Sequence, residues 1–141
     1  NDTGQIRAVA SGECQIAVVN TYYLARLAAS DDPADLAVAA AVGIVFPGQQ
    51  GNGTHVNISG AGVVSTSPNR DNAIRFLEYL TSDRAQSLFA DGNNEYPAVP
   101  SVGASSKVVA LGEFKEDGLN AAELGVHQAT AIMVFDRAGW Q

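Results

Sequence analysis

The chain has 141 residues, of which 46% are hydrophobic and 16% are charged. This composition is typical of a folded globular protein and excludes a disordered chain, which has fewer apolar residues. Eight lysines and arginines against fifteen aspartates and glutamates give a net charge of −7, which argues against a nucleic-acid-binding protein. The longest apolar stretch, residues 36–47, is about half as long as a membrane-spanning helix.

The sequence shows no export signal and no cysteine pair. Its first residues, Asn1 to Gly4, lack the basic segment and the apolar core of a signal peptide, so we expect any such signal to lie outside this chain. Cys14 is the single cysteine, which rules out an internal disulfide and predicts a small buried side chain.

Short apolar runs alternate with helical patterns in the first third of the chain. Runs rich in β-branched residues indicate buried strands, and polar N-caps and glycines indicate helix ends. The predicted elements are the end of a helix at 6–11 closed by Gly12, a strand at 15–20, a helix at 21–29, a helix from Pro33 to Ala41 after the N-cap Asp32, and a strand at 42–46.

The remaining two thirds continue the alternation, with longer helices. The predicted elements are a Gly-rich loop at 49–54, a β-rich stretch at 55–64, a helix at 69–81, a helix from Ser82 to about Ala90, an irregular stretch at 92–104, an extended segment at 108–111 and a helix at 120–137 capped by Asn120. Alternating strands and helices predict the α/β class with parallel pairing. The strands are few for the helices beside them, so we interpret the chain as part of a larger protein.

Two adjacent tyrosines, Tyr22 and Tyr23, follow the predicted strand at 15–20, where the next helix begins. Ligands of open α/β sheets gather at the carboxyl ends of strands. Helix N-termini add unpaired N–H groups and a partial positive charge, which favour anions such as phenolates. At this first turn the backbone is still leaving the strand, so both oxygens are able to converge on one ion.

A pair of phenolates suits ferric ion, a hard trivalent cation that prefers anionic oxygen donors. A phenol has a pKa of about 10 and is normally protonated at neutral pH. A bound cation reverses that preference and deprotonates its ligand. On the residues alone, the more frequent interpretation of such a pair is half-buried packing with both hydroxyls in water.

The segment GECQIAVVNTYYLARL resembles the ligand-bearing segment of periplasmic ferric-ion-binding proteins, the class II solute-binding components of bacterial iron(III) ABC importers. Their motif reads approximately G-[ED]-C-D-[IL]-A-x-x-N-[ST]-Y-Y. The likeness continues through VFPGQQGNGTHVNISGAGV, SPNRDNAIRFLEYLTSDRAQSLFADGNNEYP and LGEFKEDGLNAAELG, so it covers nearly the whole chain in order.

The resemblance implies a set of functional residues. Tyr22 and Tyr23 match the two ferric ligands, and Asn20 matches an asparagine that contacts a synergistic anion such as phosphate or carbonate. Gln15 departs from the aspartate usual at its position, which is not a ligand position. The other ligands of the family lie in the amino-terminal half, outside this sequence.

The resemblance also implies a two-lobed α/β architecture, of which this chain is the carboxyl-terminal portion. Residues 1–55 belong to the C-terminal lobe, 56–62 to the hinge crossing, 63–100 to the N-terminal lobe, and 101–141 return to the C-terminal lobe. The chain thus carries most of one lobe and a segment of the other. Because several apolar faces have lost their partners, we expect compensation by self-association or strand exchange.

By the same resemblance, the function is that of a periplasmic receptor and not of an enzyme. The whole receptor would capture Fe³⁺ between its lobes and dock on an inner-membrane ABC permease, whereas the isolated chain would bind iron weakly or not at all. An alternative keeps the fold but changes the ligand to a small anion, a polyamine, a sugar phosphate or thiamine. A further alternative, an α/β enzyme, lacks a recognisable nucleophile and base.

Four other residues invite a functional reading, but ordinary roles are expected for all of them. His55 is interpreted as a loop or hinge histidine with ordinary hydrogen bonds, and His127 as a surface or core position on the last helix. Glu95 and Tyr96, in NNEYP, recur in the family and are expected to have a structural role near the lobe junction.

Overall fold

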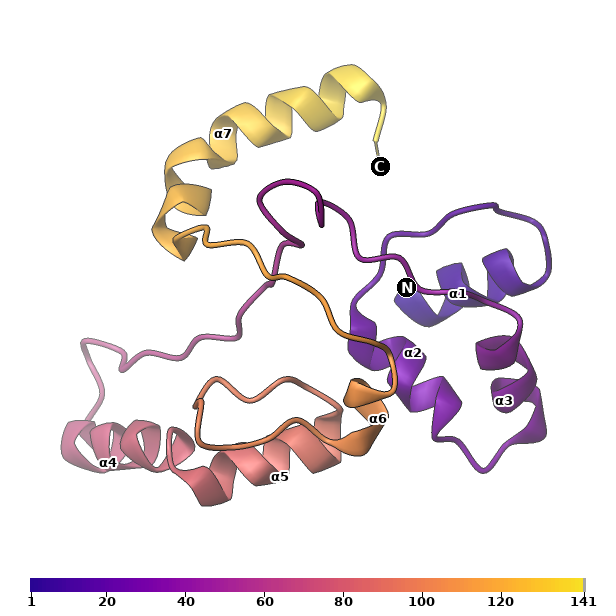
Figure 1. Ribbon diagram of the computed structural model, residues 1–141. Coiled ribbons are helices and arrows are strands. Elements are labelled where there is room, and N and C mark those ends of the chain that lie inside the picture. The colour runs from indigo at the N-terminus through magenta and orange to yellow at the C-terminus, as the bar shows by residue number, and fades with distance from the viewer. Residues whose placement is uncertain (141) are drawn as a thin grey trace. The chain divides into compact units, whose positions relative to one another are not determined.

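The structure, a computed structural model, describes residues 1–140. Helices and irregular segments make up this part of the chain (Figure 1). The helices are α1 (Asp2–Ala10), α2 (Thr21–Ala28), α3 (Pro33–Ala40), α4 (Arg70–Leu80), α5 (Asp83–Asn93), α6 (Ser106–Val109) and α7 (Ala121–Ala138).

Side-chain caps explain where the predicted helices begin. Asp32 accepts a hydrogen bond from the backbone N–H of Ala34 at 2.9 Å, and Asn120 accepts one from Ala122 at 2.9 Å. These caps satisfy N–H groups that have no partner within the helix. Ser82 caps α5 in the same way, and Gly12, with φ of 81°, follows the end of α1. The helix predictions are therefore confirmed, although α5 continues three residues beyond its predicted end at Ala90.

The predicted strands at 15–20, 42–46 and 55–64 are not strands in the described part of the chain, whose one β contact is an isolated bridge between Thr54 and Glu116. The prediction that the first two are buried is wrong here, because Ile16 and Val18 are each 83% exposed and Val45 is 85% exposed. A strand needs a neighbouring strand for its backbone N–H and C=O groups, and no such pairing forms along these segments within residues 1–140. The α/β class is therefore not confirmed.

The extended segment predicted at 108–111 is also wrong. Ser105 stands at the N-cap of the short helix α6, and the backbone N–H of Val108 donates to the Ser105 carbonyl at 3.0 Å. Val108 is fully buried, so its apolar side chain is accommodated by helical packing. A run of two valines fits either a short strand or one buried helical turn, and periodicity does not separate the two.

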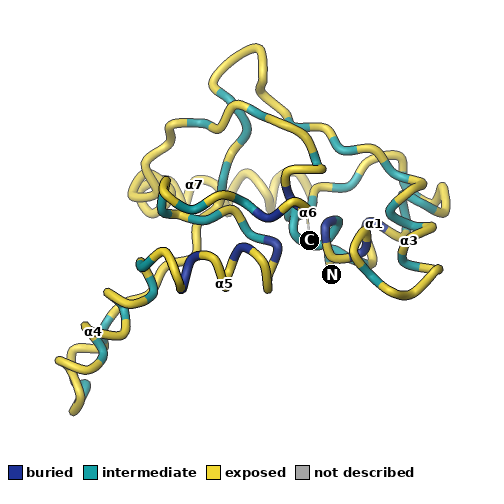
Figure 2. Tube along the Cα trace, turned by 60° about the horizontal axis from the view of Figure 1, so that its bottom comes forward, coloured by how far each residue is buried: buried dark blue, intermediate teal, exposed yellow. Residues whose placement is uncertain are grey.

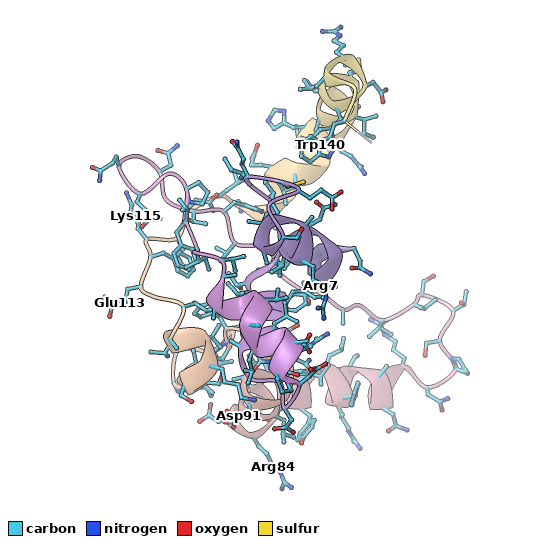
Figure 3. All side chains as sticks on the ribbon, turned by 90° about the vertical axis from the view of Figure 1, so that its right-hand side faces the viewer. Arg7, Arg84, Asp91, Glu113, Lys115 and Trp140 are labelled. Carbon is cyan, nitrogen blue, oxygen red and sulfur yellow. The ribbon has the colours of Figure 1, made fainter. Side chains whose placement is uncertain are left out.

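Two compact units make up the chain. The first consists of Asn1–Val45 and Ala61–Glu113 and contains α1 to α6. Within it α1, α2 and α3 pack together, and α6 packs against α2 (Figure 1). Arg7 of α1, labelled in Figure 3, forms an ion pair with Asp35 of α3. The buried positions of this unit, dark blue in Figure 2, include Ile6, Ala25, Leu27, Ala85, Ala90 and Val108.

The second unit consists of Phe46–Gly60 and Phe114–Gln141 and contains α7. Its two irregular segments are joined by side-chain bonds: Gln49 Oε1 accepts from the Lys115 backbone N–H at 2.7 Å. Every residue of α7 is exposed (Figure 2). In the part of the chain that the structure describes, no helix is both long and apolar enough to cross a membrane.

The predicted lobe boundaries at 55, 62 and 100 concern whole receptors. The two units, in contrast, are defined by contacts within this chain alone. The boundaries therefore stay a prediction.

The cap of α3 can be tested because Asp32 is exposed and its side-chain bond goes to the start of that helix. We expect Asp32→Ala to lower the free energy of unfolding by about 1 kcal/mol, since the Ala34 N–H loses its partner. Asp32→Ser, which restores an oxygen acceptor, should recover most of that loss. Urea unfolding of the two variants measures the difference, and equal stabilities would contradict the assignment.

Candidate metal centre

The tyrosine pair lies at the point where an extended segment becomes helix α2. Asn20 has an extended backbone, with φ of −75° and ψ of 141°, and α2 begins at Thr21. Ala25 and Leu27 are buried and anchor one side of the helix in the first unit. Tyr22 and Tyr23 therefore occupy the first helical turn, and both remain partly exposed.

The two tyrosine side chains lie together. Their ring centroids are 4.4 Å apart, and the ring planes are inclined by 35°. A hydrogen bond with Tyr23 is the main reason why the pKa of Tyr22 lies above its ordinary value of 10.0, because it stabilises the protonated phenol. The ring contact places the two phenols side by side, as two ligands of one ion must be. Neither tyrosine is sealed inside an apolar core, since both side chains are partly exposed.

A guanidinium group lies beside both rings. The Arg26 Cζ atom is 5.9 Å from the Tyr22 ring centroid and 5.5 Å from that of Tyr23, within the range of cation–π attraction. Arg26 stands four and three residues after the tyrosines, so the helix brings all three side chains to one side. The cation restrains the rings and adds positive charge where two phenolates would form.

Asn20 turns away from the helix that it precedes. Its backbone N–H donates to Asp2 Oδ2 at 3.0 Å, and its side-chain Nδ2 donates to the same oxygen at 3.3 Å. Asn20 makes no side-chain capping bond to α2. The residue expected to contact an anion is therefore oriented by a carboxylate from α1.

Two carboxylates act on Tyr22 through their charge. Asp2 and Glu95 each oppose formation of the phenolate and raise the pKa of Tyr22 further. Glu95 follows Asn94, which is buried and has the left-handed φ of 58° after α5. Burial raises the pKa of the next residue, Tyr96. Glu95 of the NNEYP segment thus acts on the pKa of Tyr22 through its negative charge, in addition to the structural role expected for the segment.

The two histidines belong to the second unit, whereas the tyrosine pair and Cys14 belong to the first. His55 belongs to the second unit, where its Nδ1 lies 3.1 Å from Asp117 Oδ2, in line with the ordinary hydrogen bonding expected of it. His127 is on the exposed surface of α7, 3.7 Å from Glu123. Cys14 is half-buried and unpaired, less enclosed than predicted. No group of three or more His, Cys, Asp or Glu side chains suited to a metal occurs among residues 1–140.

Sequence reasoning missed two residues of this site, Asp2 and Arg26. Arg26 was detectable, because its spacing from the tyrosines is that of neighbours on one helix face. Asp2 carries no such signal, since it reaches Asn20 across 18 positions of sequence through the packing of α1 beside α2.

The hydrogen bond between the tyrosines gives a testable effect on acidity. We expect Tyr23→Phe to lower the pKa of Tyr22 in the metal-free protein, because the bond that retains its proton is lost. At a pH near 10 the variant should therefore carry more Tyr22 phenolate than the wild type. NMR titration of ¹³C-labelled tyrosine measures it, and an unchanged or higher Tyr22 pKa would contradict the geometry.

Comparison with known proteins places the chain in a family. Residues 1–116 match the family described as bacterial extracellular solute-binding protein. The chain is 48% identical to iron uptake protein A1 of Synechocystis sp., over all of this chain and 39% of that protein. It thus spans about two-fifths of the length of that curated relative.

Solved structures agree with this placement. A Trichodesmium protein (IdiA, FutA), solved in complex with iron and citrate, is 53% identical with a TM-score of 0.93, over 100% of this chain and 45% of the other. The ferric binding protein of Campylobacter jejuni is 37% identical with a TM-score of 0.93, at the same coverage. Both the family match and the shared fold lead to one conclusion: the chain belongs to the bacterial extracellular solute-binding proteins.

Proposed function

We propose that this chain is the part of a periplasmic iron(III) receptor that supplies two ferric ligands, Tyr22 and Tyr23. The observation that carries the proposal is the contact between two partly exposed tyrosine rings at the first turn of α2. Relatives named for iron uptake and ferric binding support it. In this reading the protein is a receptor, whose work is selective binding and release, and not an enzyme.

The chemistry of loading is an exchange of protons for a metal ion. In the metal-free protein a hydrogen bond with Tyr23 raises the pKa of Tyr22 above its ordinary value and so keeps its proton in place. Ferric ion displaces the protons and takes both oxygens as anionic ligands. The positive charge of Arg26, near both rings, then offsets the charge of the new phenolates.

The remaining ligands come from outside this chain in our proposal. Ferric ion takes more oxygen donors than two phenolates supply, and the described residues contain no further cluster of metal-binding side chains. A synergistic oxyanion, phosphate or carbonate, would fill positions beside Asn20 at the N-terminus of α2. Citrate, present with iron in the Trichodesmium relative, is a carboxylate of the same donor class.

The rest of the receptor would also complete the fold. The exposed apolar segments around Ile16, Val18 and Val45 are then strands of an α/β sheet whose neighbours belong to the missing half. The predicted lobes, with a crossing at 56–62, describe that complete molecule. An isolated chain with such exposed segments is expected to self-associate and to bind iron weakly.

The complete receptor is proposed to close its lobes on the ion by a hinge motion and to deliver it to an ABC permease in the inner membrane. Membership in an extracellular solute-binding family and similarity to an iron uptake protein support this placement.

Removal of both hydroxyls tests the ligand assignment. In the full-length receptor, Tyr22→Phe combined with Tyr23→Phe should abolish the visible phenolate-to-iron absorption. Each single change should lower ferric affinity by more than about 100-fold, the upper range for residues that only support a ligand. Tyr79→Phe is the matched control, an exposed tyrosine on α4 that should change neither property. Full ferric affinity in the double variant would reject the proposal.

Proton release tests the same chemistry independently of colour. The wild-type receptor should release protons on loading with ferric citrate, because a phenol that becomes a metal ligand loses its proton. Tyr22→Phe should release about one proton fewer per iron bound, as measured with a pH-stat in unbuffered solution. Binding should accordingly weaken as the pH falls. Equal proton release by wild type and variant would show that Tyr22 is not deprotonated by the metal.

A further inference from the structure

We propose that α7 is an internal helix of the complete receptor, and that its apolar sides pack against the portion of the protein outside this chain. One side of the helix, a polar stripe of Glu123, His127, Thr130 and Arg137, would face the solvent. This role requires only one part of the proposed function, namely that the chain is a portion of a longer receptor, and it does not depend on the iron ligands.

The first observation is that α7 is rich in apolar side chains but is not buried. Its large apolar side chains are from 49% to 72% exposed, and they are Leu124, Val126, Ile132, Met133, Val134 and Phe135. Within the described part of the second unit, no residue of this helix is buried (Figure 2). Soluble proteins rarely expose large contiguous apolar patches, and those that they do expose mark contact surfaces.

The second observation is that most polar residues of α7 lie on one side. Glu123, Thr130 and Arg137 follow one another at intervals of seven residues, which is close to two helical turns. His127 lies about one turn after Glu123, with its Nε2 atom 3.7 Å from a carboxylate oxygen of that residue. These four residues form the polar stripe, which is the side suited to water.

Apolar side chains occupy both flanks of this stripe. At about 100° per residue, Val126 and Met133 lie on one flank. Leu124 and Phe135 lie on the other, and Ile132 lies opposite the stripe. The polar residues outside the stripe are Gln128 and Asp136. A helix that pairs with one other helix needs only a narrow apolar seam, whereas a helix that is apolar around most of its circumference is buried by several elements. A second copy of α7 would therefore cover too little of it.

The end of α7 adds a pair of aromatic side chains. Gly139 has the left-handed φ of 66°, and the Trp140 backbone N–H donates to the Phe135 carbonyl at 3.0 Å, so the chain turns back on the helix. The ring centroids of Phe135 and Trp140 lie 6.4 Å apart, within the range of an aromatic pair. Yet Phe135 is 51% exposed, and Trp140, labelled in Figure 3, is 67% exposed. Large aromatic side chains are typical anchors of a buried interface.

The length of the relatives favours the rest of the receptor as the partner of this surface. All of this chain, α7 included, matches the Trichodesmium protein with a TM-score of 0.93, but it spans only 45% of that protein. The helix thus belongs to the shared fold, and most of the longer chain has no counterpart here. A lipid surface fits less well, because helices that lie on membranes carry many Lys and Arg on their polar side, and the polar stripe has only Arg137 against Glu123.

Photocrosslinking in the purified full-length receptor tests both the surface and its partner. The photoreactive p-benzoyl-phenylalanine takes the place of Phe135, which has a similar shape, or of Thr130 on the polar stripe as the matched control. We expect the probe at position 135 to form crosslinks to peptides from outside the 141 residues of this chain, and the probe at position 130 to form none above background. Crosslinks from position 135 to residues 1–120 or to a second copy of the receptor, equal yields at both positions, or no crosslink at all would each overturn the proposal.

Hydrogen exchange in the unaltered receptor covers the case in which the probe at position 135 prevents folding. Most of the stability of a helix in a protein comes from packing, so a covered α7 should be protected like a helix with buried residues. We expect its backbone amides to exchange within about tenfold of the rate of those in α2, where Ala25 and Leu27 are buried. Exchange of α7 at the rate of an unfolded peptide, beside a protected α2, would contradict the proposal.

The receptor that carries both Tyr22→Phe and Tyr23→Phe separates this role from the ferric ligands. Crosslinking and hydrogen exchange at α7 should be the same in that variant as in the wild type. Iron colour that persists in it would refute the ferric ligands and leave α7 unaffected, whereas an exposed α7 in the wild-type receptor would refute only the packing role.

Discussion

The hydrogen-bonded contact between the Asp2 carboxylate and Asn20 is the one on which the position of the tyrosine pair depends. It ties the last residue of an extended segment to α1 and fixes the place where the backbone turns into α2. Tyr22 and Tyr23 follow directly, so the direction of both side chains is set by that turn and by the buried side of the helix. A regular helix would separate adjacent side chains by about 100°. At this first turn the two ring centroids instead lie 4.4 Å apart.

The site combines features that hold protons in the absence of metal and release them in its presence. The bond between the phenols and the carboxylates of Asp2 and Glu95 all favour protonated Tyr22. Arg26 beside the rings supplies the opposite charge. These influences on the protonation of Tyr22 are small compared with that of a bound trivalent cation, because a coordinated cation acts at bonding distance. The result is a Tyr22 phenol that favours its protonated form in the absence of a metal.

The parts of the fold and of the candidate site that could be predicted are those that depend on residues close together in the sequence. Caps such as Asp32 and Asn120 marked helix starts because their hydrogen bonds are made within a few residues. The tyrosine pair was recognisable from its place in the segment, and the structure adds that the two rings lie in contact. Strands could not be settled from the sequence, because Ile16 needs a neighbour from elsewhere in space to become part of a sheet. The contact between Asp2 and Asn20 could not be predicted for the same reason, since it arises from the packing of α1 beside α2.

The central claim is that Tyr22 and Tyr23 bind one ferric ion through both phenol oxygens. A crystal structure of the full-length receptor, grown with ferric ion and bicarbonate, tests it most directly. The account predicts a single ion bonded to both oxygens, with the hydrogen bond between the tyrosines replaced by the metal. An ion bound elsewhere, while the two hydroxyls remain bonded to each other, would contradict it.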